Sequence, residues 1–462
     1  MSQPKPLPTP AARRLGLLAL GLATLLPMLG GSLANMVLPA LGQAFGVPFA
    51  SLQWVLVAYL LGITCLTVVA GRLGDRFGRR RLLLLGLGLF ALASLLCALA
   101  PTIGWLIAAR ALQGIAAACM LSLALAMVGQ LVPPARRGWG MGLLGTLSAC
   151  GTALGPSFGG LLTASFGWQA PFLLLVPLSL LALGCARLGL PRDDCSPQGE
   201  GMNLTSLSLL VAALLCYGLA LTLGGALALW WGAGALLVTG SFIRRERRAP
   251  VPLLPLALLG APGLSNGLLA SALVASVMVL TLLIGPFYLR GVFGLGLGTV
   301  GLMISGGPLL AALTGMPAGW LVDRLGARQV VRLGLAVMGA AALGLAGAAG
   351  QFGPLGYLLP ILLLTAGYAL FQTANNSAVV GEASEQTRGA VAGLLTLSRN
   401  LGQLTGVAGL GGLFAALVGE QGLTLASELV FGTRALFALS TLLIGLAFWL
   451  VGRRREGVPV RA

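Results

Sequence analysis

The sequence predicts an all-α polytopic membrane protein with about fourteen membrane-spanning helices, arranged as two six-helix bundles and one inserted pair. Of its 462 residues, 57% are hydrophobic and only 8% are charged, and the mean hydropathy is +0.97. A soluble domain has about a quarter of its residues charged, so this composition indicates that lipid surrounds most of the chain. Apolar runs near the ~20 residues that cross a bilayer recur along the whole length.

The apolar runs between charges and Gly/Pro clusters predict the individual spans. The first run follows MSQPKPLPTPAARR and is too long for the apolar part of a cleaved signal peptide, about 7–15 residues, so we interpret it as the first span. The predicted spans are 15–41, 51–71, 82–100, 104–131, 138–163, 170–190, 203–223, 226–243, 265–288, 297–319, 330–349, 354–380, 389–417 and 434–452.

Arginines lie between alternate pairs of spans, and this alternation predicts the orientation of the chain. The opposite loops, such as GQAFGVPFAS and APTIG, carry no charge. Because cytoplasmic loops are enriched in Lys and Arg, the pattern places both termini in the cytoplasm and requires an even number of spans. It also accounts for the net charge of +17. No nucleic-acid partner is expected, since no basic stripe is interleaved with aromatic residues.

An internal repeat divides the chain. The decapeptide GRLGDRFGRR at 71–80 aligns without gaps with GWLVDRLGAR at 319–328, and each follows the second span of a six-span block. Such repeats are typical of secondary transporters, which bind substrate between the halves. The predicted organisation is an N-terminal tail 1–14, a six-helix bundle 15–190, a linker with two extra spans 191–264, a second bundle 265–452 and a C-terminal tail 453–462.

Several motifs together resemble the major facilitator superfamily, in particular its fourteen-helix drug:proton antiporter branch. They are GRLGDRFGRR, RALQG at 110–114, GTALGPSFGG at 151–160, SLANMVLP at 32–39, QWVLVAYLL at 53–61 and LSRNLGQLTG at 397–406. The resemblance covers nearly the whole chain. It implies a multi-pass protein of a bacterial-type inner (plasma) membrane that exports small amphipathic compounds or drugs by alternating access, with protons as a possible coupling ion.

The repeated loop is interpreted as a cytoplasmic latch. A carboxylate at Asp75, at the end of the second span, can face the positively polarised N-terminus of another helix, and the resemblance places that partner near Gly389. Glycines permit the tight turn, and arginines can pair with acids or lipid phosphates. The alternative is a plain positive-inside loop. The latch residues are Gly71, Asp75, Arg76, Gly78, Arg79, Arg80, Asp323 and Arg324.

A second candidate site consists of polar residues at membrane depth. Arg110 shares a helix face with Gln113, and a charge at this depth should face a cavity or a partner. The resemblance implies a role in coupling or in substrate charge, whereas the alternative is a structural arginine bonded to carbonyls. The other candidates, which line a cavity or join helices, are Asn35, Gln53, Gln372, Asn375, Asn376, Arg399 and Gln403, with Trp54, Tyr59 and Asn400 beside them.

The fifth span carries a glycine stripe at i, i+4 and i+8 beside a proline. Small residues let two helices approach closely, and a proline kink can act as a pivot. Close helix packing is expected whether or not the protein is an exporter. The resemblance further implies that this segment acts as an antiporter-type hinge. The residues are Gly151, Gly155, Pro156, Gly159 and Gly160.

The sequence departs from the family pattern at Gly30, which occupies the place of an aspartate in the first span. There is no histidine, and every acid lies in a predicted loop or at a helix end, so no deep side chain titrates near neutral pH. The acids are Asp75, Asp193, Asp194, Glu200, Glu246, Asp323, Glu382, Glu385, Glu420, Glu428 and Glu456.

Three functional interpretations therefore stay open. The first is an exporter whose coupling has moved to boundary acids such as Asp75 or Glu382. The second is a carrier of an anionic or neutral metabolite, since Arg110 and Arg399 make the interior positive. The third is a sensor or assembly partner that keeps the fold. No catalytic residue, metal site or cofactor is expected, because no nucleophile–base pair, metal-ligand cluster or Walker-type loop is present.

If Asp75 is a latch, Asp75→Asn should slow transport, because an amide interacts more weakly than a carboxylate with a helix N-terminus. Membrane insertion and expression should stay at the wild-type level, and both are measured alongside transport in inverted vesicles. Unchanged transport would rule out the latch.

Overall fold

The structure is a computed structural model of the full chain. It describes residues 10–133, 137–191, 193, 204–223, 225–249, 253, 256–260, 262–381, 388–422 and 425–452, apart from some of their side chains, those of Arg72 and Asp75 among them.

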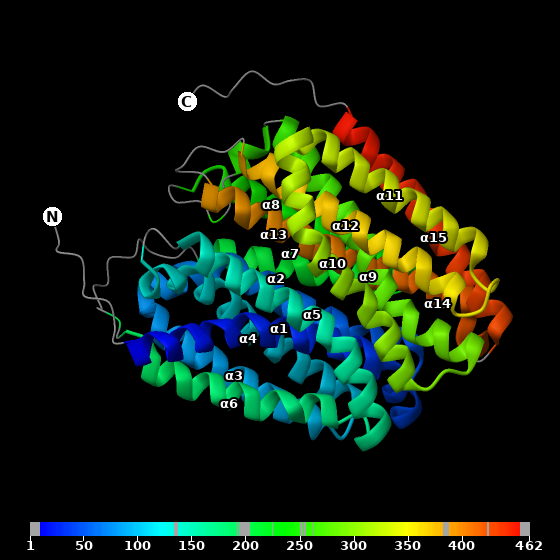
Figure 1. The fold of residues 1–462 in the computed structure, drawn as a ribbon, viewed down its shortest axis with the longest axis horizontal. Coiled ribbons are helices and arrows are strands. Elements are labelled where there is room, and N and C mark those ends of the chain that lie inside the picture. Colours follow the sequence, from blue (N-terminus) through cyan, green and yellow to red (C-terminus); the bar gives the residue numbers. More distant parts are fainter. Residues whose placement is uncertain are drawn as a thin grey trace. The chain divides into compact units, whose positions relative to one another are not determined.

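The described residues form long helices joined by short turns, in the order shown in Figure 1. Thirteen helical segments of this part of the chain are long and apolar enough to cross a membrane, and α5 is a further helix of 30 residues. The prediction of an all-α membrane protein with about fourteen spans is confirmed. The elements are α1 (Pro10–Phe45), α2 (Phe49–Phe77), α3 (Arg79–Ala98), α4 (Ile103–Leu131), α5 (Arg137–Phe166), α6 (Ala170–Gly189), α7 (Leu204–Thr222), α8 (Gly225–Glu246), η2 (Leu256–Gly260), α9 (Pro262–Phe293), α10 (Leu297–Leu325), α11 (Ala327–Ala348), α12 (Leu355–Gly381), α13 (Arg388–Thr405), η3 (Gly406–Leu410), α14 (Gly411–Gly422) and α15 (Ala426–Gly452).

The chain forms two compact units. Unit 1 comprises Met1–Phe45 and Ala58–Asn203, and unit 2 comprises Gly46–Val57 and Leu204–Ala462. The start of α2 therefore belongs to unit 2 and its remainder to unit 1.

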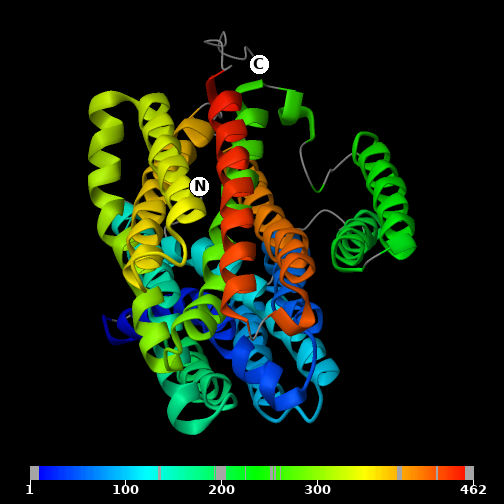
Figure 2. The same ribbon diagram turned by 90° about the vertical axis from the view of Figure 1, so that its right-hand side faces the viewer.

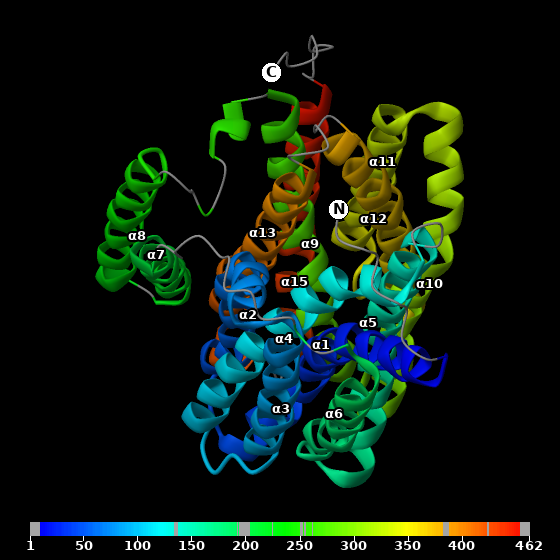
Figure 3. The same cartoon turned by 90° about the vertical axis from the view of Figure 1, so that its left-hand side faces the viewer.

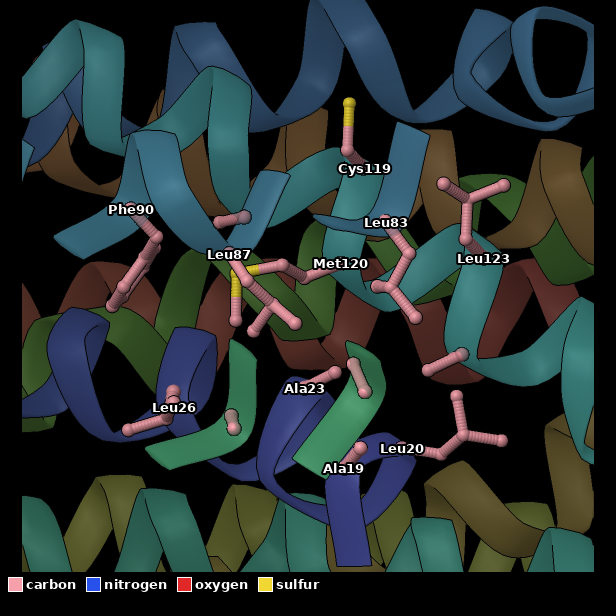
Figure 4. Packing of buried hydrophobic residues seen from close by; sticks show 14 of the residues in the cluster. Ala19, Leu20, Ala23, Leu26, Leu83, Leu87, Phe90, Cys119, Met120 and Leu123 are labelled. Carbon is pink, nitrogen blue, oxygen red and sulfur yellow. The ribbon is translucent and has the colours of Figure 1, made fainter. Parts of the chain in front are cut away.

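In unit 1, α1 packs on α4, α5 and α6, while α3 packs on α4 and α6. Its apolar core lies where α1, α3 and α4 meet, and Figure 4 shows the side chains of Leu20, Leu87 and Met120 in this cluster. These residues are fully buried, which indicates that α1 is an interior helix rather than a lipid-facing one.

In unit 2, α9 takes the corresponding central position, in contact with α12, α13 and α15. Its core joins Val274 and Val277 of α9 to Leu335 and Met338 of α11. The inserted helices α7 and α8 pack against each other and stand at the edge of this unit (Figures 2 and 3).

Glycines on α5 allow that helix to reach the backbone of α1. A Cβ added at Gly155 would lie 2.5 Å from Cβ of Ser32, and one at Gly151 would lie 3.1 Å from the amide nitrogen of Leu29. The hydroxyl of Ser32 also donates to the carbonyl of Gly151 at 3.3 Å. Helices in lipid associate through such close packing rather than through the hydrophobic effect, so the stripe fixes α5 against α1.

We expect Gly155→Val to lower the free energy of unfolding by about 1–3 kcal/mol, because the added carbons overlap α1. The measurement is thermal unfolding in detergent. Gly145→Val on the same helix is the matched control, since a Cβ there would meet nothing within 4 Å. Equal destabilisation by the two variants would contradict the close-packing interpretation.

Candidate functional site

Arg110 of α4 is fully buried inside unit 1. Its Nη1 atom donates to the carbonyl oxygen of Gly30 on α1 at 3.2 Å and to Oε1 of Gln113, one turn along α4. A carbonyl and an amide oxygen are neutral acceptors, and they compensate part of the cost of removing the guanidinium from water. The structure thus joins the sequence-predicted Arg110 and Gln113 directly.

The hydrogen bonds continue from Gln113 to α3. Nε2 of Gln113 donates to Oγ of Ser94 at 2.8 Å, and that hydroxyl donates to the carbonyl of Phe90 at 2.6 Å. Ser94 is fully buried, like Gln113. Sequence reasoning missed Ser94, because a single serine in an apolar helix carries no pattern that sets it apart.

Tyr59 of α2 covers the guanidinium. The Cζ atom of Arg110 lies 4.2 Å from the centroid of the Tyr59 ring, and the Tyr59 hydroxyl donates to the carbonyl of Pro27 at 2.7 Å. A cation over an aromatic face gains about 2 kcal/mol when both are desolvated. Glycines bring the two helices together: a Cβ at Gly62 would lie 2.5 Å from the carbonyl oxygen of Ala111 on α4.

Gly30 lies beside this network. A Cβ added there would lie 3.8 Å from Nε2 of Gln113, 3.2 Å from Cζ of Phe90 and 3.3 Å from a methyl of Leu175. The position that lacks the family's aspartate is thus adjacent to the buried arginine. An acid here would reach the same polar groups after small shifts of the two apolar neighbours.

The turn of the repeated loop is made by Gly78, which has a φ of 96° between α2 and α3. A Cβ at this position would also lie 2.7 Å from Cγ of Asp193, which follows α6. The Asp193 carboxylate accepts from the backbone N–H groups of Arg80 and Arg81, both at 2.9 Å. It therefore caps the N-terminus of α3, where a negative charge is stabilising. No sequence pattern predicted this role for Asp193.

The repeated arginines bind the end of the last helix of their own unit, α6 in unit 1 and α15 in unit 2. Nη2 of Arg80 donates to the carbonyl of Arg187 at 2.7 Å in unit 1. In unit 2, Nη2 of Arg328 donates to the carbonyl of Gly452 at 3.1 Å. Carbonyls in the last turn of a helix lack an intrahelical partner, which makes them good acceptors for a cation.

The remaining candidate latch residues differ in their contacts and in their exposure. Gly71 lies within α2 and not in a turn, contrary to expectation, because the helix continues to Phe77. Arg79 donates to the carbonyl of Ala126 at 3.3 Å. Arg324 stacks over Trp320 at 4.1 Å. Arg76 and Asp323 are exposed, and the side chain of Asp75 lies outside the described part, so its latch role stays a prediction.

The amide candidates have different partners within their own units. Nδ2 of Asn375 on α12 donates to the carbonyl of Gly267 on α9 at 3.1 Å, which joins helices within unit 2. Asn35 donates to Gly31 on its own helix at 3.2 Å. Gln53 is 1% exposed and lies beside Gly411 of α14. The half-buried candidates of unit 2 are Gln372, Asn376, Arg399 and Gln403.

Acidic groups stay near helix ends in the part of the chain that the structure describes. Each of the six acids in this part lies within two residues of a helix end or outside the helices, and they are Asp75, Asp193, Glu246, Asp323, Glu420 and Glu428. Within the described ranges, no three His, Cys, Asp or Glu side chains gather as metal ligands would.

The chain is similar to known transporters over most of its length. It is 32% identical over 412 residues to an uncharacterized transporter of Escherichia coli K12, YebQ, covering 86% of this chain and 89% of that protein. It is 29% identical to the tetracenomycin C resistance and export protein of Streptomyces glaucescens, covering 87% and 76%. It is 28% identical to the riboflavin transporter RibZ of Clostridioides difficile 630, covering 84% and 85%.

The fold is also that of a solved transporter. A bacterial homologue of the human lysosomal transporter Spinster, in an inward-facing and unoccupied conformation, matches with a TM-score of 0.71 at 16% identity, covering 96% of this chain and 97% of that one. The family model of the Major Facilitator Superfamily matches residues 20–407 and 268–461. The chain therefore belongs to the major facilitator superfamily and is a multi-pass membrane transporter of a small-molecule substrate.

Proposed function

We propose that the protein is an efflux antiporter for small amphipathic compounds. The observation that carries this proposal is the α5 stripe: the exporter-type motif GTALGPSFGG presents Gly151 and Gly155 to the backbone of α1. The similarity to a tetracenomycin C export protein supports the same direction of transport. Pro156 lies beside the stripe and is the proposed pivot. Gly159 continues the packed face, since a Cβ there would lie 3.0 Å from Cβ of Met36 on α1, and Gly160 follows it as a buried residue of α5.

In this proposal the protein lies in a bacterial-type inner membrane with both termini in the cytoplasm. The arginine distribution supports that orientation. The transporter works by alternating access, and the repeated loops Gly71–Arg80 and 319–328 control its cytoplasmic side. Arg80 and Arg328 would hold the end of the last helix of each unit while Asp75 acts as the latch.

Arg110 is the proposed coupling or substrate-charge residue. Its guanidinium stays protonated at physiological pH, so it cannot itself carry the exchanged proton. It can, however, change the proton affinity of a nearby acid or bind a negatively charged group of the substrate. In an antiporter without an acid at Gly30, the proton carriers are boundary acids such as Asp75 or Glu382, the latter outside the described residues.

A second function is a carrier of an anionic or neutral metabolite. The buried Arg110, whose bonded acceptors Gly30 and Gln113 are neutral, favours an anionic group more than a cation. The similarity to a riboflavin transporter supports this class as well.

Proteoliposomes with an internal pH dye separate the two functions. Tetraphenylphosphonium serves as the lipophilic cation and an aromatic carboxylate as the anion. Proton movement triggered by the cation supports drug antiport. Anion counterflow without proton movement, lost in Arg110→Ala, supports the metabolite carrier and overturns the export proposal.

We expect Gly30→Asp to increase the proton flux that tetraphenylphosphonium triggers, because the new carboxylate lies next to Gln113 and Arg110. Gly30→Asn is the matched control, since it has the same size but does not titrate. Equal fluxes in the two variants would show that position 30 does not take part in coupling.

Arg110→Lys should lower the maximum transport rate by about tenfold or more. A lysine keeps the charge but cannot stack flat on Tyr59, and a hydrogen bond to a charged group contributes about 1.5–3 kcal/mol, where ~1.4 kcal/mol is tenfold in rate. Transport is measured per protein molecule in proteoliposomes with whichever of the two probes the wild type moves. The control is Arg81→Lys, whose side chain is exposed.

A purely structural role for Arg110 predicts a different result. In that case Arg110→Lys would lower thermal stability and the amount of inserted protein, while the rate per molecule would stay at the wild-type value.

A further inference from the structure

A π turn interrupts the long helix of unit 2 that runs from α13 into α14. The membrane-spanning segment Val391–Gly419 runs from α13 through the π-helix η3 into α14. A π turn bonds i to i+5 instead of i+4, and single π turns in helices are frequent at functional positions. The extra residue rotates everything after it by about 100° around the helix axis. Here it determines which face of α14 meets the neighbouring helices.

Close-packed glycines lead into this turn. A Cβ at Gly402 would lie 2.8 Å from Cα of Ala272 on α9, and one at Gly406 would lie 2.9 Å from Cα of Ser276. The pair is spaced i, i+4 and faces the first long helix of the bundle, as Gly151 and Gly155 of α5 face α1. In α5 the close contact is followed by Pro156, whereas in unit 2 it is followed by the π turn.

The inserted helix α7 contacts the rest of unit 2 at this turn and at α13. The hydroxyls of Tyr217 on α7 and Thr405, the last residue of α13, are 2.7 Å apart. Because the Thr405 hydroxyl donates to the carbonyl of Leu401 at 2.7 Å, the Tyr217 hydroxyl is the donor of the pair. Leu221 of α7 covers the turn itself, with a methyl 3.6 Å from the Cβ position of Gly409.

The residue after the turn meets a polar group. A Cβ at Gly411 would lie 2.7 Å from Nε2 of Gln53, which has no hydrogen-bond acceptor among the described residues. Burying a hydrogen-bond donor without an acceptor costs free energy. The contact between Gln53 and the start of α14 therefore adds little to the stability of this conformation. The segment after the π turn thus packs against a neighbour from which it can separate.

We propose that α7 holds the π turn and that Tyr217 is a positioning residue for the conformational cycle. The Tyr217–Thr405 hydrogen bond fixes the last turn of α13, and Leu221 covers Gly409, so the inserted pair keeps η3 in its π register. The turn is the counterpart in unit 2 of the proline pivot of α5. The proposal rests on the protein being an alternating-access transporter, but not on which substrate it moves.

Hydrogen exchange followed by mass spectrometry tests the positioning directly in the full-length protein in nanodiscs. Tyr217→Phe and Thr405→Val each remove one hydroxyl of the pair. We expect amide exchange within residues 402–412 to become about two- to tenfold faster, the range for losing one side-chain hydrogen bond. The double variant should resemble Thr405→Val, because that variant has already lost both the bond to Tyr217 and the bond to the carbonyl of Leu401. Thr222→Val is the control, since its hydroxyl bonds to Gly218 within α7.

Transport by the same variants tests the link to the cycle. With the probe that the wild type moves in proteoliposomes, Tyr217→Phe should change the maximum rate at least about threefold while KM stays within about twofold. Exchange at 402–412 equal to that of Thr222→Val overturns the proposal, and so does faster exchange with an unchanged maximum rate. The exchange measurement needs no substrate. Its result therefore tests the role of Tyr217 even if the export proposal is wrong.

Discussion

Close approach of helix backbones, made possible by glycine, is the constraint on which the rest of this structure depends. In lipid the hydrophobic effect gives little attraction between helices, so packing and interhelical hydrogen bonds must hold the bundle together. Gly155 brings α5 onto α1, Gly62 brings α2 onto α4, and Gly402 brings α13 onto α9. The contact at Gly62 lies between the same two helices, α2 and α4, as the contact of the Tyr59 ring with the Arg110 guanidinium.

The buried arginine shows how such a bundle accommodates a charge. The Arg110 guanidinium donates to a backbone carbonyl of α1 and to a side-chain amide oxygen of its own helix, and it lies over an aromatic ring of α2. Each compensates part of the desolvation cost, yet none is an acid. A charge stabilised in this way keeps a strong attraction for anionic groups, which is why Gly30 bears directly on the choice between drug antiport and metabolite transport.

The two units form corresponding helix contacts, in part through different residues. Arg80 and Arg328 each bind a carbonyl at the end of the last helix of their unit, so the repeat preserves this contact. The corresponding helices differ: α5 carries Pro156 after its close-packed glycines, and unit 2 carries a π turn after Gly406. A proline removes one helical hydrogen bond by its own covalent structure, whereas a π turn needs support from its surroundings.

The sequence by itself determined the fold class, the approximate number of spans, the family and the burial of Arg110 with Gln113. Apolar length, arginine placement and helical spacing are local properties, and lipid leaves few alternatives to a helix. Tertiary structure alone decided the contacts between distant residues. Asp193 caps a helix 113 residues away, and Tyr217 meets Thr405 across 188 residues. The hydrophobic pattern of the sequence also did not predict the π turn, because the register of this turn depends on which neighbouring residues pack against it.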